Sequence, residues 1–595
     1  MSSLRSYRNQ PTDHTTFYPR LIGKRGAVAS NSYLSAEAGA ELLRAGGNAI
    51  DAACAATLVE GLVNPHMNGI GGECPMLIRP AGSKEVFSIN GNAAAPMSAT
   101  PEAFTSRGLK DVPDIGVLAA GVPATFSALV KVLQRWGSRS FAEVAAPAIH
   151  LAKTGHAAQC GLVHQQKYGL TDCVDRLRQW PGSWNLYYPN GKIPEVGQLL
   201  TNPALAQTYE RIAAAEAAAG GDRVAKLDAA RAVFYTGEVA QEIARFVKSQ
   251  DGLLDANDLA RYETHIEAPA AMRFGGQFGE VELFKCGIWS QGPAAIQTLQ
   301  IMQQWDLKAM GHGSADYCHL LIEAMKLAFA DREQYYADPL ATSVPTETLL
   351  SAHYGQQRAA LIDMRASSTA HRPGDAWKNT ALLEAHAHFL PAPWGRGTVH
   401  VDAVDAQGNM ASFTPSGGWI PSSPVIPSLG FPLSIRMMTF YLTPKNHPNV
   451  VAPGKRPRTT LTPGMAFKDG KPWMSFGTMG GDQQEQWLIQ FFLNRAVFGM
   501  TIQQAIEAPK LSIEHLPGFF APHNFFPNRV RVEPRIGKAA LDALAQRGHE
   551  VDIGPDWTEG FITAIQFNED TGVLEAGVDP RGSKSEAFPQ WACVW

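Results

Sequence analysis

The chain has 595 residues, of which 45% are hydrophobic and 18% charged, and its formal net charge is −4 at pH 7. This balance is typical of a folded globular protein and unlike that of a disordered chain. Nucleic-acid binding usually requires a basic face, so the interspersed charges argue against nucleic acid as a main partner. No apolar run approaches the roughly 18 residues needed to span a bilayer, and no membrane partner is expected.

The N-terminus and the cysteines give little sign of secretion. Residues 1–18 are polar and lack the apolar segment of a secretory signal, which favours a cytoplasmic over a periplasmic location. The seven cysteines contain no Cys-x-x-Cys pair, so we expect buried free thiols rather than disulfides or a zinc site. His386 and His388 are the closest histidine pair, which we interpret as incidental rather than as a metal site.

The first part of the chain alternates strand and helix signals around a run of glycines. A strand is predicted over residues 26–30, a helix over 36–45 capped by Ser35, and a second helix starting at Asn48. The run Gly69-Ile70-Gly71-Gly72 lacks the Gly-Lys-Ser/Thr ending and the spacing of a nucleotide-binding loop. We therefore predict no phosphate site there.

The middle of the chain is mainly helical. Residues 200–264 are rich in alanine and glutamate, and a strand over 281–284 separates them from further helices. One helix is predicted to continue over 294–305 after Pro293. Another begins at Ser314 and runs to about Tyr336, with an apolar stripe at helical spacing that we interpret as core.

Residues 398–416 contain the pattern of a β-hairpin. Residues 399–403 and 410–414 alternate apolar and polar side chains around a polar turn. If the turn centres on Gln407, three pairs of residues face each other across the hairpin, and directly opposed Cβ atoms lie roughly 4.5–5.5 Å apart. The pairs are Thr398 with Ser416, His400 with Thr414, and Asp402 with Ser412.

One face of this hairpin is entirely polar, and two interpretations are open: the face is in contact with water, or it supports a reactive group. The position of Thr398 favours the second. Gly397-Thr398 follows an irregular segment over 367–396 and opens the first strand. If the 397–398 bond is cut, Thr398 gains an α-amine with a pKa of about 7.7–8.0, which can act as the base for its own hydroxyl.

This stretch resembles the processing site of the γ-glutamyltransferase family, whose pattern is Thr-Thr-His-aromatic-Ser followed by Asp-x-x-Gly-Asn. Thr398, His400 and residues 405–409 match that pattern, whereas Val399 and Asp402 stand in place of the second Thr and the Ser. Further matches in family order lie at 46–53 (Gly-Gly-Asn-Ala-Ile-Asp-Ala-Ala), 455–460 (Lys-Arg-Pro-x-Thr-Thr), 477–481 (Gly-Thr-Met-Gly-Gly) and 579–581 (Asp-Pro-Arg).

The resemblance implies an α+β fold, the four-layer αββα sandwich of the N-terminal nucleophile hydrolases. In that family one precursor is cut into two interleaved chains. Applied here, residues 1–397 would form the large chain and residues 398–595 the small chain. The two chains would stay associated after processing, and a homodimer of the pair is an open alternative.

The reaction implied is acyl transfer from a small-molecule amide through a Thr398 acyl-enzyme. The Thr398 α-amine would accept the proton, and the N–H groups of Gly480 and Gly481 would stabilise the oxyanion. Ser416 occupies the place of a family hydroxyl that hydrogen-bonds the nucleophile. Water or an amine acceptor would release the acyl group, and neither a cofactor nor a metal would be needed.

The positions that hold a γ-glutamyl group in the family differ here. Asn92 stands in place of the early arginine, Thr439 in place of an acid, and Arg436 has appeared nearby. A substrate ammonium beside Arg436 would be costly, whereas a carboxylate held by Arg436, Thr459 and Thr460 would be well bound. We therefore predict an amidase for acyl groups that carry a carboxylate but no α-ammonium.

Three alternatives remain. Asp482 could supply the missing acid, which would make the protein a genuine γ-glutamyl transferase or glutathione hydrolase. The departures at Val399 and Asp402 leave room for an inactive member of the family that acts as a binding protein. A serine hydrolase using Ser416 is disfavoured, because Thr-Pro-Ser-Gly-Gly is not the Gly-x-Ser-x-Gly elbow.

Overall fold

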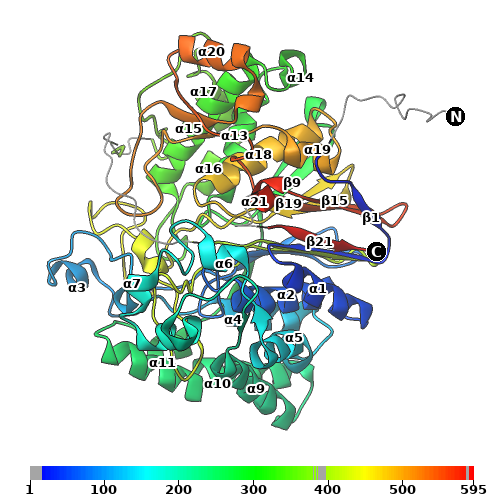
Figure 1. Ribbon diagram of the computed structural model, residues 1–595. Helices are drawn as coiled ribbons and strands as arrows, with labels where there is room; N and C mark the ends of the chain where they lie inside the picture. The colour runs from blue at the N-terminus through cyan, green and yellow to red at the C-terminus, as the bar shows by residue number, and fades with distance from the viewer. Residues whose placement is uncertain (1–15, 379–380, 384, 386–396, 585–588) are drawn as a thin grey trace, which may run out of the picture.

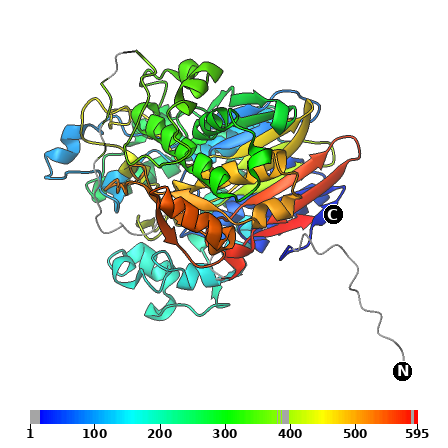
Figure 2. The same ribbon diagram turned by 90° about the horizontal axis from the view of Figure 1, so that it is seen from above.

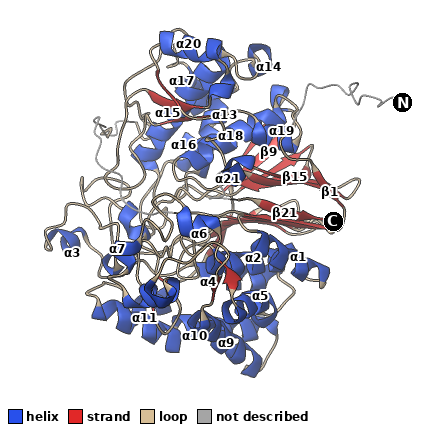
Figure 3. Ribbon diagram, in the orientation of Figure 1, coloured by secondary structure: helices blue, strands red, loops and turns tan. Residues whose placement is uncertain are grey.

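The structure, a computed structural model, describes residues 16–378, 381–383, 385, 397–584 and 589–595. Two β-sheets are stacked face to face at its centre, and helices cover the outer face of each sheet (Figures 1 and 3). The four layers confirm the predicted αββα sandwich. Apolar side chains fill three spaces, one beneath each helical layer and one between the sheets.

Each central sheet has seven strands, and neighbouring strands within it are antiparallel. The first sheet contains, in spatial order, β1 (Leu21–Gly23), β20 (Val573–Val578), β19 (Thr563–Asn568), β15 (Lys471–Gly477), β14 (Gly464–Lys468), β9 (Val281–Lys285) and β8 (Ala270–Phe274). The second contains β21 (Trp591–Val594), β2 (Gly26–Ser30), β10 (Val401–Asp405), β11 (Met410–Phe413), β3 (Met76–Arg79), β4 (Phe87–Asn90) and β7 (His265–Glu267).

The two helical layers come largely from different parts of the chain (Figure 1). The layer on the second sheet contains α1 (Tyr33–Arg44), α2 (Ala49–Val63), α4 (Thr125–Trp136), α5 (Phe141–Thr154), α9 (Pro203–Ala218), α10 (Arg223–Tyr235) and α11 (Glu238–Ser249). The layer on the first sheet contains α13 (Gly292–Met302), α15 (Ala315–Tyr335), α17 (Ala352–Ala359), α18 (Gln483–Ala496), α19 (Ile502–Glu507) and α20 (Lys538–Gln546).

The remaining elements are short. Small sheets are formed by β16 (Leu511–Ile513), β17 (Arg529–Val532) and β18 (Glu550–Ile553), by β12 (Val425–Ile426) and β13 (Phe431–Pro432), and by β5 (His156–Ala157) and β6 (Leu199–Leu200). The short helices include α3 (Pro101–Thr105), α6 (Cys160–His164), α7 (Val174–Leu177), α8 (Pro181–Tyr187), α12 (Ala256–Arg261), α14 (Leu307–Met310), α16 (Thr346–Leu349), α21 (Pro580–Lys584) and the 3₁₀ turn η4 (Arg436–Thr439).

Several helices start at the capping signals in the sequence. Asn48 and Asp51 form a reciprocal capping box at the start of α2, and the Ser314 side chain accepts from the third residue of its helix. The prediction that Ser35 caps α1 is wrong. That helix begins at Tyr33, and the Ser35 hydroxyl instead donates to the Ala56 carbonyl at 2.8 Å.

The predicted apolar stripe of α15 belongs to the core, as expected. The helix is buried on nearly all of its faces, including the polar residues near its C-terminal end. When a helix is buried on all of its faces, its polar side chains are also buried, and each needs a hydrogen-bond or ion-pair partner. This is how Arg332 reaches Asp482 in the site described below.

Both ends of the chain contribute to each sheet. β1 pairs with β20 and β2 pairs with β21, so blue and red strands lie side by side in Figure 2. The hairpin β10–β11 is inserted between β2 and β3 in the second sheet. Residues after Thr398 therefore share every central layer with residues before it.

Candidate active site

Thr398 and Ser416 lie opposite each other at the open end of the β10–β11 hairpin. They form an antiparallel bridge, and the strand register continues with Asp402 opposite Ser412, as predicted. Thr398 Oγ1 is 3.1 Å from Ser416 Oγ and donates to the Gly397 carbonyl at 2.9 Å. Both side chains are buried, Thr398 retaining 7% exposure, so the two hydroxyls meet away from bulk water.

The polar face of the hairpin is buried between the two sheets. β10 packs on β19 and β11 on β15, so the face lies against the other sheet. His400 Nδ1 is 3.0 Å from Thr414 Oγ1, and its Nε2 is 3.0 Å from a carboxylate oxygen of Asp402. The interpretation that this face contacts water is therefore wrong. Most of its polar groups are hydrogen-bonded to one another, as is usual for buried polar groups.

The two departures from the family pattern are accommodated by their surroundings. Val399 is fully buried and packs with Met67 and Met479. Asp402 pairs with His400 and is also within 3.4 Å of the Thr563 hydroxyl, which lies on the facing sheet. Neither residue disturbs the contact between the Thr398 and Ser416 hydroxyls.

A cavity of about 270 Å³ opens beside Thr398. It is bounded by the hairpin end, the glycine loop after β15, and loops from both halves of the chain. The lining residues are Met67, Gln165, Tyr168, Gly397, Thr398, Trp419, Thr460, Met479, Gly480, Gly481, Asp482, Gln483, Phe520 and Phe561. Much of this wall is aromatic or thioether, with polar groups concentrated near Thr398 and the glycine loop.

Gly480 and Gly481 form the loop between β15 and α18 and line the same cavity as Thr398. Gly480 has φ +124°, and a Cβ there would lie 2.5 Å from the indole of Trp487. Trp487 in turn donates to Glu559 at 3.0 Å, which fixes the ring under the loop. Only glycine fits this position, and the bare backbone is left to face the cavity.

Asp482 lies on the cavity wall with both carboxylate oxygens occupied. Arg332 Nη1 donates to one oxygen at 2.5 Å, and the backbone N–H of Phe519 donates to the other at 2.9 Å. Its side chain is 16% exposed, whereas that of Arg332 is 1% exposed. The charge of Asp482 is thus compensated by the buried Arg332, and Asp482 is not available as an unpaired partner for a substrate ammonium.

Arg436 is not free to hold a substrate carboxylate, which corrects the role expected for it. Its Nε donates to Glu73 at 2.5 Å, and Nη2 also contacts Glu73. Nη2 further donates to Ser416 Oγ at 2.7 Å. The side chain is buried and does not line the cavity. Glu73 directly follows the glycine run at 69–72 and lies far from Arg436 in the chain.

Of the other predicted substrate contacts, Thr460 lines the cavity and three do not. The Asn92 amide donates to the Pro457 carbonyl, and the Thr439 hydroxyl donates to the Arg436 carbonyl at 2.9 Å. The Thr459 N–H donates to the Trp289 carbonyl at 2.9 Å. These three residues lie away from the cavity wall and have contacts within the protein, and their contact with substrate stays a prediction.

The aromatic wall of the cavity was not predicted. Tyr168, Trp419, Phe520 and Phe561 come from four separate loops, and none belongs to a motif. Trp419 alone had a local signal, since it follows Ser416 by three residues across Gly417-Gly418. Tyr168, Phe520 and Phe561 reach the site through long-range packing, which cannot be predicted from a single sequence.

Two further expectations concern metals and membranes. His386 and His388, and the residues immediately before Gly397, lie outside the described residues. Within the described part of the chain, no group of three or more His, Cys, Asp or Glu side chains is arranged to hold a metal ion. No helix there is long and apolar enough to cross a bilayer.

Comparisons with known proteins agree with this geometry. The sequence profile of the gamma-glutamyltranspeptidase family matches residues 35–588. The Bacillus subtilis (strain 168) glutathione hydrolase-like YwrD proenzyme is 29% identical over 94% of this chain and 98% of its own. The structure of LmbA2991T421A is 40% identical with a TM-score of 0.90, covering 98% of this chain and 100% of that one. The cephalosporin acylase from Bacillus halodurans is 28% identical with a TM-score of 0.82, covering 99% of each chain.

Proposed function

The chain belongs to the gamma-glutamyltranspeptidase family, and we propose from this premise that Thr398 is the nucleophile of a self-processing amidohydrolase or acyltransferase. One observation carries the assignment of the nucleophile. The Thr398 hydroxyl lies on the cavity wall, 3.1 Å from the Ser416 hydroxyl and 2.9 Å from the carbonyl of its own N-terminal neighbour. A relative named as a proenzyme supports self-processing.

Cleavage between Gly397 and Thr398 would divide the protein into residues 1–397 and 398–595. The two chains would remain together, because β10 is paired with β2 and β11 with β3. Separating them would expose the buried faces of both sheets and the shared core. The product is therefore expected to be a stable complex of two chains.

In the mature enzyme the Thr398 hydroxyl attacks the carbonyl of a small-molecule amide, and the new α-amine accepts its proton. The backbone N–H groups of Gly480 and Gly481 are the proposed donors to the oxyanion, and their position on the same cavity wall as Thr398 supports this role. Collapse of the intermediate expels the amine product. Water, or an amine acceptor, then attacks the Thr398 ester and releases the acyl group.

The acyl group is expected to be uncharged. Among the described residues that line the cavity there is no lysine or arginine, and the one acid, Asp482, is already paired with Arg332. The carboxylate preference predicted from the sequence depended on a free Arg436, and the Glu73 ion pair removes that basis. A γ-glutamyl group would bring two charges into a wall that has no free partner for either.

Three matched anilides test this proposal: butyryl, glutaryl, and γ-glutamyl p-nitroanilide differ only by an added carboxylate and then an added ammonium. The butyryl compound should be hydrolysed at least as well as the glutaryl one, and the γ-glutamyl compound about tenfold or more slowly, measured as kcat/KM. Thr398→Ala should turn over none of them.

The other outcomes identify the rival functions. A strong preference for the glutaryl anilide would indicate a cationic group that binds the acyl carboxylate. A preference for the γ-glutamyl anilide would indicate a glutathione hydrolase. An uncut chain that hydrolyses no amide would support the inactive binding protein instead.

A further inference from the structure

The carbonyl oxygen of Gly397 is surrounded by hydrogen-bond donors. Ser416 Oγ donates to it at 2.8 Å and the indole Nε1 of Trp419 at 2.7 Å. The Thr398 hydroxyl, the proposed attacking group, is 2.9 Å away. A peptide carbonyl accepts two good hydrogen bonds through its lone pairs. Two side-chain donors, both buried, are therefore aimed at the one carbonyl that self-cleavage would attack.

Arg436 contacts both of these donors. Its Nη2 donates to Ser416 Oγ at 2.7 Å, and its guanidinium carbon lies 4.8 Å from the centroid of the Trp419 ring. A guanidinium can only donate, and a serine hydroxyl has a single proton. Because Arg436 occupies a lone pair of Ser416, the serine proton is left to point at Gly397. The arginine thus sets the direction of one donor and brings positive charge close to the other.

The surrounding chain is shaped to hold this arginine in place. Glu73 accepts from Arg436 Nε at 2.5 Å and from the Ser434 hydroxyl at 2.6 Å. Gly417 has φ +76°, and a Cβ there would lie 2.5 Å from the Glu73 carboxylate. A side chain at this position would push Glu73 away from Arg436. The glycine thus permits the turn that directs Ser416 and Trp419 at one oxygen atom.

We propose that Ser416 and Trp419 form the oxyanion hole of the self-cleavage step, and that Arg436 is its positioning residue. This rests on the proposed function, since it requires attack by Thr398 on Gly397. The Thr398 Oγ1 bonds to the Gly397 carbon, its proton passes to the leaving amide nitrogen, and the 397–398 C–N bond breaks. Water then hydrolyses the resulting ester, which releases a Gly397 carboxylate and restores the Thr398 hydroxyl.

This oxyanion hole differs from the oxyanion hole proposed for substrate turnover. The Gly480 and Gly481 N–H groups serve a substrate carbonyl that enters the cavity, whereas Trp419 Nε1 serves the peptide carbonyl that precedes Thr398. In the uncut chain Trp419 shares its N–H between Gly397 and the Met67 carbonyl, 2.9 Å away. Developing charge on Gly397 would draw that proton toward it. Removing the indole N–H should therefore slow self-cleavage far more than substrate turnover.

The test is a pulse–chase in cell-free translation, with the rate of self-cleavage followed by the disappearance of the full-length band. Trp419→Phe keeps an aromatic ring beside Arg436 but removes the N–H, and should slow cleavage about 10²-fold or more. Arg436→Gln should slow it in the same direction, and Ser416→Thr, which keeps the hydroxyl, should recover most of the rate lost in Ser416→Ala. Trp473→Phe, a substitution of another buried indole, is the matched control and should cut at the wild-type rate.

Turnover per cut molecule, measured after each variant has processed fully, provides the second readout. Trp419→Phe should slow self-cleavage by a much larger factor than it slows turnover, because the Gly397 carbonyl is no longer joined to Thr398 in the cut enzyme and the aromatic ring of the cavity wall is kept. Unfolding midpoints in a Thr398→Ala background, where no chain is cut, identify any variant that fails to fold. A wild type that cuts while Trp419→Phe cuts equally fast overturns this inference and leaves the proposed function standing. A wild type that never cuts at 397–398 overturns the proposed function itself.

Discussion

At the scale of single residues, the site depends on hydroxyl groups that meet in a buried place. The Ser416 hydroxyl is hydrogen-bonded to Gly397 and accepts from Arg436, and it lies beside Thr398. Replacing it leaves a buried guanidinium N–H and a buried carbonyl short of a partner. Each such loss costs about 1–3 kcal/mol in a folded protein.

Ser416→Ala should therefore lower turnover about tenfold or more and also lower the free energy of unfolding by about 1–3 kcal/mol. This loss of stability could not be predicted from the sequence, because the burial of Ser416 and its contact with Arg436 are not visible there. Ser475→Ala is the control, since Ser475 is equally buried and its hydroxyl has no partner among the described residues. Steady-state rates and urea unfolding give both quantities. Turnover equal to wild type would remove Ser416 from the site.

The residues of the site differ in how far the sequence could predict them. Thr398 and Ser416 were predictable because strand periodicity and the turn position fix cross-strand partners, and the structure has that register. Arg436 was misassigned because its partner Glu73 lies far away in the chain, and burial decided which charge it met. Ion pairs of this kind depend on the tertiary fold, so proximity in a motif is a poor guide to them.

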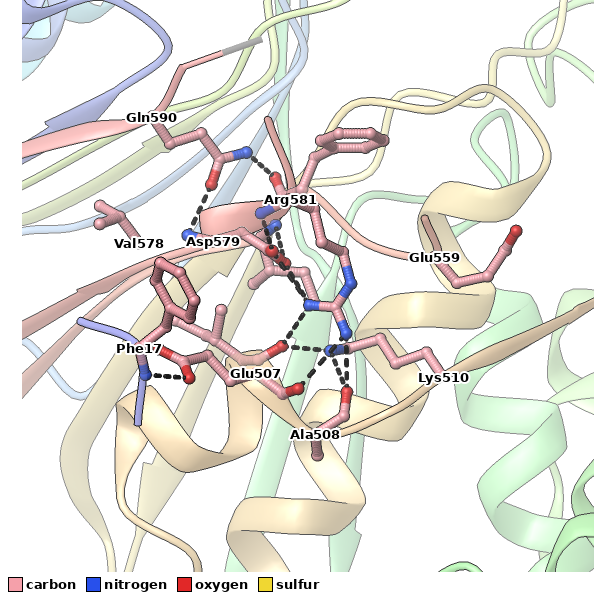
Figure 4. Close-up of polar contacts among 12 residues, drawn as sticks. Phe17, Glu507, Ala508, Lys510, Glu559, Val578, Asp579, Arg581 and Gln590 are labelled. Carbon is pink, nitrogen blue, oxygen red and sulfur yellow. Dashed lines mark hydrogen bonds and ion pairs between the residues drawn. The ribbon is translucent and has the colours of Figure 1, made fainter. Parts of the chain in front are cut away.

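At the scale of elements, the closing Asp-Pro-Arg motif at 579–581 links the end of β20 to the end of α19 (Figure 4). Arg581 is fully buried and pairs with Glu533 at 2.7 Å and with Asp579 at 3.0 Å. It also donates to the Ala508 carbonyl at 2.9 Å. Carbonyls at the C-terminal end of a helix lack partners within the helix, so a buried cation there stabilises it.

Lys510 joins the same network. Its ammonium nitrogen contacts the Ile506 carbonyl and lies 3.0 Å from that of Ala508 (Figure 4). Burial lowers the pKa of Lys510 to about 7, with a smaller contribution from the charge of Arg581. Arg581 is therefore the main cation of this cluster at neutral pH. The motif does not line the cavity, and we interpret it as a structural link.

Arg581→Met should lower the free energy of unfolding by about 3–5 kcal/mol, because it leaves Glu533 and Asp579 as buried acids without their main partner. Denaturant unfolding in the uncut Thr398→Ala background measures this loss. Lys471→Met is the control, since the Lys471–Asp570 pair is exposed and exposed ion pairs contribute little to stability. If Arg581→Met lowers the free energy of unfolding no more than Lys471→Met does, the motif does not stabilise the fold by linking these elements.

Elements with strong local signals were predicted well. The caps of α2 and α15 and the strand β2 follow from the sequence, because capping and apolar alternation act over a few residues. The start of α1 was missed because Ser35 lies inside the helix, where its hydroxyl donates to the Ala56 carbonyl of α2, and the side chain of Ser32 at the N-cap position makes no capping hydrogen bond. The burial of the polar hairpin face was left open because it depends on the second sheet, which no local pattern reveals.

At the scale of the whole molecule, the central layers are shared by the parts of the chain before and after Thr398. β10 and β11 lie inside a sheet whose other members precede them, apart from β21 at its edge. The stacking of two sheets was implied by the family resemblance, and the order of strands comes from the structure alone, because periodicity gives neither. Such a fold can be cut once in a loop without losing its core.

The division of the chain at Gly397–Thr398 is the central claim, and intact mass spectrometry of freshly purified protein tests it most directly. We expect two species, with the masses of residues 1–397 and 398–595, and for Thr398→Ala one species with the mass of the full chain. A wild-type protein that has only the full-length mass, and that still hydrolyses amides, would contradict the account.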